Sequence, residues 1–158
     1  MDEIERKFLV DAEPAIIEGH TPTRIRQGYL AITDDTEVRV RSRDGDHVLT
    51  VKGGRGLVRR EVSVPLTPNQ FDELWPLTAG RRINKRRWVI PHDDGVELEI
   101  DVFDDELDGL VIAEIEFDSE QASDAFVAPD WFGREVTDDS RYRNAALATE
   151  GLVSEHTQ

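Results

Sequence analysis

Charged residues two positions apart are the most informative feature of this 158-residue sequence. Residues two apart on a β-strand point to the same face of a sheet, so each pair presents its two charges together. Pairs of carboxylates can bind hard divalent cations, and pairs of Arg and Lys can bind phosphate groups. Together they would suit a polyanion that is bound with a divalent metal ion. The pairs are Glu3/Glu5, Arg39/Arg41, Arg59/Glu61, Lys85/Arg87, Glu99/Asp101 and Glu114/Glu116.

Each pair taken alone has an ordinary interpretation as part of a solvated outer face of a sheet. Three observations favour a shared interior instead. Arg and Glu are weak choices for strand surfaces compared with Thr or Tyr, and the same pairing recurs on nearly every strand. The opposite faces are apolar enough to need covering by helices. These apolar positions include Ile4, Val38, Val40, Val62, Val89, Leu98, Ile100 and Ile115.

The charges are also unevenly distributed along the chain. The segment from Arg24 to Arg87 contains 14 of the 19 Lys and Arg residues, whereas the segment from Trp88 to Gly133 contains none. A fold that brings the two segments together would therefore place acidic residues against basic ones.

Alternation and turn residues predict about eight strands and few helices. Thr67 is expected to cap a helix that begins with Pro68, and further helices are expected over residues 119–125 and around 142–150. Short turns between strands predict an antiparallel sheet or barrel. We expect one domain over residues 1–150 and a frayed tail over 151–158. The expected strands span residues 3–10, 24–33, 36–43, 47–52, 57–65, 82–91, 96–103 and 110–118.

Composition excludes several classes of protein. The net charge of −15 excludes nucleic-acid or anionic-membrane binding that is driven by net charge. The chain has no Cys, which excludes a disulfide scaffold and a thiolate zinc site. No apolar run approaches the roughly 18 residues of a membrane span, and the first ten residues carry charges where a signal peptide is apolar. We therefore expect a cytoplasmic protein with no nucleic-acid or membrane partner.

The first charged pair belongs to an ExExK motif, Glu3-Ile4-Glu5-Arg6-Lys7. In order, the sequence continues with RxR at Arg39 and Arg41, Lys52 at the end of the next strand, RxE, KxR, ExD and ExE. In this order the motifs resemble those of the CYTH, or triphosphate tunnel metalloenzyme, superfamily, and especially its short bacterial members. The segment from Glu135 to Asn144 is similar to the closing segment of these proteins. The resemblance implies a mainly β (α+β) fold: an eight-stranded antiparallel β-barrel tunnel with a charged lumen and a few flanking helices.

The resemblance also implies a reaction on a triphosphate with bound Mg²⁺ or Mn²⁺, cations that prefer the oxygen ligands present here. Attacking water would be activated by a metal ion at Glu3 and Glu5. Glu5, Lys85 and Tyr29 are the expected catalytic residues, and the Tyr29 hydroxyl would lie near Lys85, although Tyr29 also suits simple packing. Glu61 and Glu99 would support neighbouring side chains. The expected metal ligands are Glu3, Glu5, Asp101, Glu114 and Glu116, and the expected substrate-binding residues are Lys7, Arg39, Arg41, Lys52, Arg59, Lys85 and Arg87.

Inorganic tripolyphosphate is the expected substrate, because the short chain shows no extra aromatic pocket for a base or a thiazole. The alternatives are a class IV adenylate cyclase, a thiamine or nucleoside triphosphatase, and a non-catalytic module that binds polyphosphate or nucleotide. A full set of acids argues against the last, since anion binding alone needs no metal ligands. Arg43 is expected at the rim, and Arg141 and Arg143 at the tunnel mouth or at a helix cap. A homodimer is a further expectation that no residue pattern demonstrates.

Overall fold

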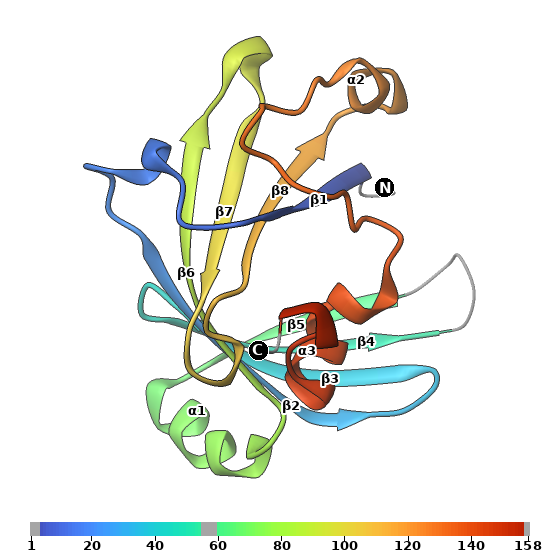
Figure 1. The fold of residues 1–158 in the computed structure, drawn as a ribbon. Coiled ribbons are helices and arrows are strands. Elements are labelled where there is room, and N and C mark those ends of the chain that lie inside the picture. The colour runs from blue at the N-terminus through green and yellow to red at the C-terminus, as the bar shows by residue number, and fades with distance from the viewer. Residues whose placement is uncertain (1–3, 55–59, 157–158) are drawn as a thin grey trace.

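A computed structural model describes residues 4–54 and 60–156, and in these residues eight strands form one antiparallel sheet (Figure 1). The strand order is β1-β8-β7-β6-β2-β3-β4-β5. The predicted strands are confirmed in the described residues, with ends that differ by a few residues, and residues 57–59 of the strand expected over 57–65 lie outside the described residues. Their bounds are β1 Ile4–Val10, β2 Thr23–Ile32, β3 Thr36–Arg43, β4 Asp46–Gly53, β5 Arg60–Leu66, β6 Arg82–Pro91, β7 Glu97–Phe103 and β8 Val111–Phe117.

Three short α-helices accompany the sheet: α1 Pro68–Leu74, α2 Glu120–Ala125 and α3 Asn144–Glu150. Thr67 begins α1 with a capping box, in which its hydroxyl accepts from the Gln70 N–H and the Gln70 side chain accepts from the Thr67 N–H. No helix in the described ranges is long and apolar enough to cross a membrane. Single turns of 3₁₀-helix occur at Ala15–Ile17, Trp75–Thr78, Asp93–Gly95, Asp105–Leu107, Ser140–Tyr142 and Ser154–His156.

The sheet curves into the expected tunnel fold but does not close as a barrel. β1 and β5 stand at its two ends, and no pairing joins them in the residues that the structure describes. The reason at β1 is that residues 133–136 already occupy its outer edge. The Leu9 N–H donates to the Arg134 carbonyl at 2.9 Å, and the Val136 N–H donates to the Lys7 carbonyl at 2.8 Å.

The outer face of the sheet carries most of the predicted apolar positions. Leu98, Ile100 and Ile115 are fully buried there, in a cluster that Phe126 and other residues after α2 cover. Helix α1 packs on β3, β4 and β5. Two positions differ from the expectation. Val62 on the end strand β5 is 52% exposed, and Val89 is 40% exposed and shares the inner face with Arg87.

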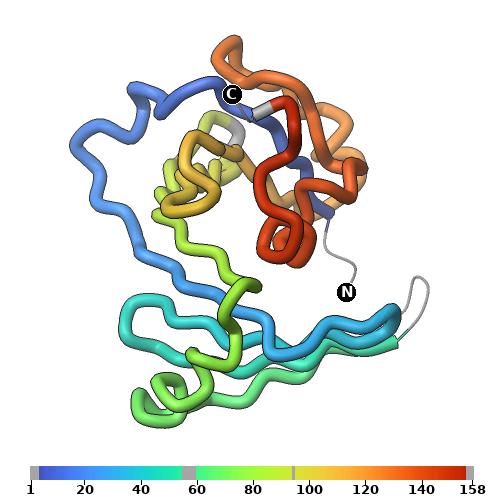
Figure 2. The backbone as a smooth tube through the Cα atoms, turned by 60° about the horizontal axis from the view of Figure 1, so that its bottom comes forward, coloured from blue at the N-terminus to red at the C-terminus, as the bar shows by residue number. Residues whose placement is uncertain are grey.

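The inner face is apolar at one end, where the C-terminal segment covers it. Leu147 and Ala148 of α3 belong to a buried cluster with inner-face residues of β1, β8, β7, β6 and β2. Figure 2 shows this red segment between the β1–β8 side of the sheet and the strands β3–β5. Val153 is buried in the same cluster, so residues 151–153 pack against the domain, which differs from the expected frayed tail. The charged residues of the predicted pairs lie on the rest of the inner face, with a few uncharged residues among them.

Candidate functional site

The register of three neighbouring strands gathers carboxylates on one part of the inner face. Glu5 lies opposite Glu116, and Lys7 lies opposite Glu114, across the β1–β8 pair. Glu114 lies opposite Glu99 across the β8–β7 pair. Directly opposed residues of antiparallel strands point to the same face, so all of these side chains share one surface. We call Glu5, Glu99, Glu114 and Glu116 the acidic wall.

Strands β3 and β4 supply a second charged surface, the basic wall, which consists of Arg39, Arg41 and Lys52. Glu61 on β5 lies between two of these cations, with its carboxylate oxygens 3.9 Å from Arg39 Nη2 and 3.9 Å from Lys52 Nζ. Arg39 Nε is buried and has no hydrogen-bond partner among the described residues. Because a buried unpaired donor is costly, this atom indicates a place where an anion would be stabilised.

Arg87 on β6 connects the two walls. Its Nε and Nη2 donate to the two oxygens of Asp101 at 2.7 and 2.8 Å, and its Nη1 lies 3.0 Å from Glu99 Oε2. Burial lowers the pKa of Arg87, but Asp101 and the acidic residues around it outweigh burial and raise the pKa above its usual value. The positive charge of Arg87 also lowers the pKa of both Glu114 and Arg41. The side chain therefore remains a fixed cation where the acidic and basic walls meet.

Arg41 lies in a strongly cationic environment. Burial lowers its pKa from the ordinary value, and the neighbouring positive charges of Arg39, Arg43 and Arg87 lower it further. A set of like charges held this close is favourable only when anions offset it. The basic wall therefore has the electrostatic character of a polyanion site.

Both carboxylate oxygens of Asp101 bind cationic side chains. Lys85 Nζ donates to its Oδ2 at 2.7 Å, and Arg87 binds both of its oxygens. Burial acts to raise the pKa of Asp101, but Lys85 and Arg87 outweigh burial and hold the pKa at about 2. Burial also lowers the pKa of Lys85, and Asp101 opposes that change. Asp101 therefore anchors two cations of the inner face.

Tyr29 also differs from the expectation of a hydroxyl that an adjacent ammonium acidifies. Its hydroxyl accepts a hydrogen bond from Gln27 Nε2 at 3.0 Å, and the ammonium of Lys85 binds Asp101 instead. Burial raises the pKa of Tyr29, with Arg39 opposing the shift. Tyr29 belongs to the apolar cluster under α3. This position agrees with the alternative interpretation, in which Tyr29 serves in packing.

Glu114 is a buried carboxyl of the acidic wall with a strongly raised pKa. Burial, a hydrogen bond with Glu5 and the negative charge of Glu5 raise the pKa of Glu114 to about 7, while Lys7 opposes the shift. In the described ranges no group of three or more Asp, Glu or His side chains converges as a metal-binding cluster. Glu5 and Glu114 nevertheless interact on one face, and carboxylate oxygens are the ligands that Mg²⁺ and Mn²⁺ prefer, so the donor set fits either cation.

Glu3 and Arg59 lie outside the described residues. Arg43 lies opposite Ile25 on the inner face. Arg141 binds Asp139, with Nη2 2.6 Å from Oδ2, and Arg143 begins α3 without a side-chain cap.

Sequence reasoning missed two buried polar residues of the inner face. Gln27 is 3% exposed and Thr50 is 6% exposed, and they lie opposite Arg41 and Arg39 respectively. The available signal was that Gln27 alternates in phase with Tyr29 and Thr50 in phase with Lys52, but uncharged side chains on a strand resemble ordinary surface positions.

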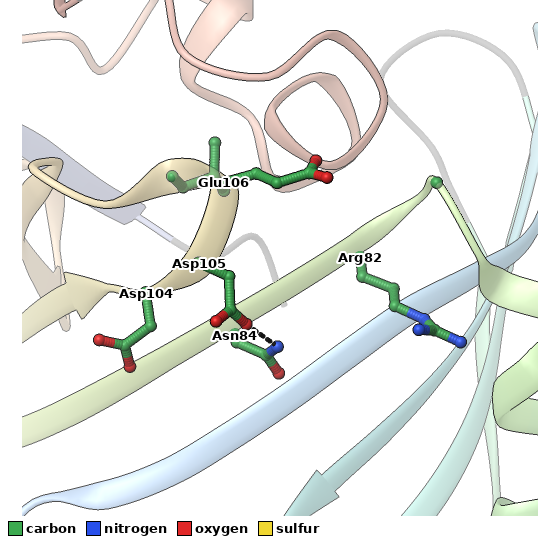
Figure 3. A pocket seen from close by; sticks show the side chains of 7 residues that line it. Arg82, Asn84, Asp104, Asp105 and Glu106 are labelled. Carbon is green, nitrogen blue, oxygen red and sulfur yellow. Dashed lines mark hydrogen bonds between the residues drawn. The ribbon is translucent and has the colours of Figure 1, made fainter.

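A separate pocket of about 210 Å³ lies beside β6 (Figure 3). Arg82 and Asn84 line it, and by alternation they point away from the face of Lys85 and Arg87. Asn84 donates to Asp105 across the pocket. This pocket contains none of the predicted site residues. Its lining is Gly80, Arg82, Asn84, Asp104, Asp105, Glu106 and Leu107.

Comparison with known proteins agrees with the fold and with the arrangement of charges. Curated relatives include proteins named inorganic triphosphatase. One from Nitrosomonas europaea is 46% identical over 94% of this chain and 97% of the relative. Another from Acetivibrio thermocellus is 38% identical over 92% of each chain.

Solved structures with the same fold also match this chain. A crystal structure of an inorganic triphosphatase matches with a TM-score of 0.79 and 42% identity, over 94% of this chain and 95% of that chain. A Pyrococcus horikoshii protein with 19% identity and a TM-score of 0.55, over 78% of this chain and 82% of that chain, shares the fold alone. The CYTH domain model matches residues 1–147. The chain therefore belongs to the CYTH domain family.

Proposed function

We propose that this protein hydrolyses inorganic tripolyphosphate to diphosphate and phosphate with the help of Mg²⁺ or Mn²⁺. The observation that carries the proposal is the meeting of an acidic wall and a basic wall at Arg87 on one face of the sheet. The names of the two curated relatives support the same activity. The acidic wall would hold metal, and the basic wall would hold phosphates.

The basic wall supplies the grip on the substrate in this proposal. Arg39 and Arg41 offer planar guanidinium groups that can bind phosphate oxygens in pairs, and Lys52 offers a point charge. The unpartnered Nε of Arg39 supports this role. Lys7 would add a contact from the acidic side, where its ammonium lies 3.6 Å from Glu5 Oε1. Glu61 would keep Arg39 and Lys52 in place when no substrate is bound.

Glu5, Glu114 and Glu116 would hold the metal, together with Glu3, which the structure does not describe. A bound Mg²⁺ or Mn²⁺ would offset phosphate charge and lower the pKa of an attacking water. The protein's own contribution is positional. Lys85 and Asp101 would fix Arg87, and Arg87 with Arg41 would stabilise charge on the transferred phosphoryl group and on the leaving diphosphate.

The test is an assay of purified protein with tripolyphosphate, ATP or thiamine triphosphate, each with Mg²⁺, with Mn²⁺ and with chelator. We expect phosphate release from tripolyphosphate to exceed release from ATP at least about tenfold, because both curated relatives are named inorganic triphosphatase. Formation of cyclic AMP from ATP would instead support the adenylate cyclase alternative. Tight binding of tripolyphosphate without turnover under either metal would support the non-catalytic binding module.

We also propose a cytoplasmic location, a single domain that extends past residue 150 to the buried Val153, and a homodimer in solution. Sedimentation equilibrium of the purified chain, whose calculated mass is 17.9 kDa, would separate a monomer from a dimer.

A further inference from the structure

The outer edge of β1 is held by a short segment that we call the strap, Gly133–Thr137. Two of its backbone contacts are described above, and a third runs from the Gly133 N–H to the Leu9 carbonyl at 2.6 Å. A Cβ atom at Gly133 would lie 2.9 Å from that carbonyl oxygen, so only glycine permits this close approach. The strap therefore pairs with β1 along the edge that would otherwise be free.

Side chains strengthen the same connection. The Lys7 N–H donates to Thr137 Oγ1 at 3.0 Å, and the Thr137 hydroxyl donates to Glu135 Oε2 at 3.1 Å. Arg6 Nε then donates to Glu135 Oε1 at 3.0 Å. This chain of hydrogen bonds begins and ends on consecutive residues of β1. It therefore fixes the strand at the residue whose side chain faces the site.

The position of β1 matters because Lys7 and Glu5 both project from it onto the inner face. Lys7 lies opposite Glu114 and lowers the pKa of that carboxyl, and its ammonium lies 3.6 Å from Glu5 Oε1. An end strand that is paired on one side only opens more easily than a central strand. Loss of the strap would consequently change the distances within the acidic wall.

We propose that Thr137 is a positioning residue for the site: through its hydrogen bond to the Lys7 N–H, it holds β1 so that Lys7 can contact the substrate. This inference rests on the proposed function. Thr137 acts through Lys7 and touches neither substrate nor metal. The ExExK motif and the other charged pairs do not contain Thr137. Its role follows only from the contact between the strap and β1.

The test compares Thr137→Val, which keeps the shape and removes the hydroxyl, with Thr137→Ser, which keeps the hydroxyl. The matched control is Thr67→Val, because the Thr67 hydroxyl also accepts one backbone N–H, from Gln70 at 3.2 Å, at a helix far from β1. We expect Thr137→Val to raise KM for tripolyphosphate about fivefold, the effect of one hydrogen bond, with kcat changed less than about twofold. Thr137→Ser and Thr67→Val should keep the wild-type KM.

Calorimetric binding of tripolyphosphate without divalent metal gives a second measurement that needs no turnover. Thr137→Val should raise Kd by a similar factor. Glu135→Gln weakens the hydrogen bonds that Glu135 accepts from Arg6 and Thr137. This variant should shift KM and Kd in the same direction if Thr137→Val does not fold. A wild-type KM and Kd in both variants, or a KM in Thr67→Val that rises as much as in Thr137→Val, would overturn the inference. Absence of hydrolysis by the wild type would overturn the proposed function, while the binding comparison would still decide the role of Thr137.

Discussion

The Lys85 ammonium nitrogen lies 2.7 Å from Asp101 Oδ2, and the two side chains are only 5% and 3% exposed. Such a pair offsets the cost of burying either charge, but it leaves a large penalty if one partner is removed. Asp101 also binds Arg87, which stands between the acidic and basic walls. The pair therefore links the stability of the sheet to the geometry of the proposed site.

Asp101→Asn should destabilise the fold by about 3–5 kcal/mol, because Lys85 would keep a buried charge without a compensating one. Chemical denaturation of wild type and variant measures this difference. The control is Asp104→Asn, which weakens a half-exposed pair with Arg86 at 3.0 Å and should cost about 1 kcal/mol or less. Equal losses in the two variants would contradict the importance of the buried pair.

The same carboxyl predicts a pH dependence of stability. Its pKa is about 2 in the folded protein and 3.8 in its ordinary state. Below about pH 4 the unfolded chain takes up a proton that the folded chain does not, so this contribution is present above that pH and is lost as pH falls toward 2. The stability difference between wild type and Asp101→Asn should therefore shrink by about 2 kcal/mol between pH 5 and pH 2. A difference that stays constant over this range would contradict the assignment.

Arg41→Ala should weaken substrate binding more than it slows the chemical step. Arg41 lies in the basic wall, and removal of its guanidinium would raise KM for tripolyphosphate about tenfold or more, with a smaller change in kcat. Steady-state kinetics measure both constants. Arg24→Ala is the control, because Arg24 is an exposed residue of β2 whose neighbour across the sheet is Arg86 and not a site residue. A wild-type KM in Arg41→Ala would remove Arg41 from the proposed grip.

The sequence predicted the strands and their faces well, because period-two alternation and turn residues are local signals. The charged pairs also predicted the inner face, since alternate positions on a strand must share a face. The sequence could not show that the sheet stays open, because the strap that occupies the outer edge of β1 lies more than 120 residues further along the chain. The ion pair of Asp101 with Arg87 could not be predicted for a related reason. It depends on the cross-strand register, which places the two residues directly opposite each other.

Glu5→Gln should abolish most turnover while tripolyphosphate still binds. The substitution keeps the size of the side chain but removes the negative charge that faces Glu114, and a neutral amide is a weaker ligand for Mg²⁺ or Mn²⁺ than a carboxylate. We expect kcat to fall by about two orders of magnitude and the affinity for Mn²⁺ alone, measured by titration, to fall as well. Glu13→Gln is the control, because Glu13 is an exposed carboxylate that contacts Arg86 at 3.5 Å, away from the inner face. A variant that kept wild-type turnover and Mn²⁺ affinity would contradict the metal role of Glu5. The role of Glu5 would then be limited to its ion pair with Lys7.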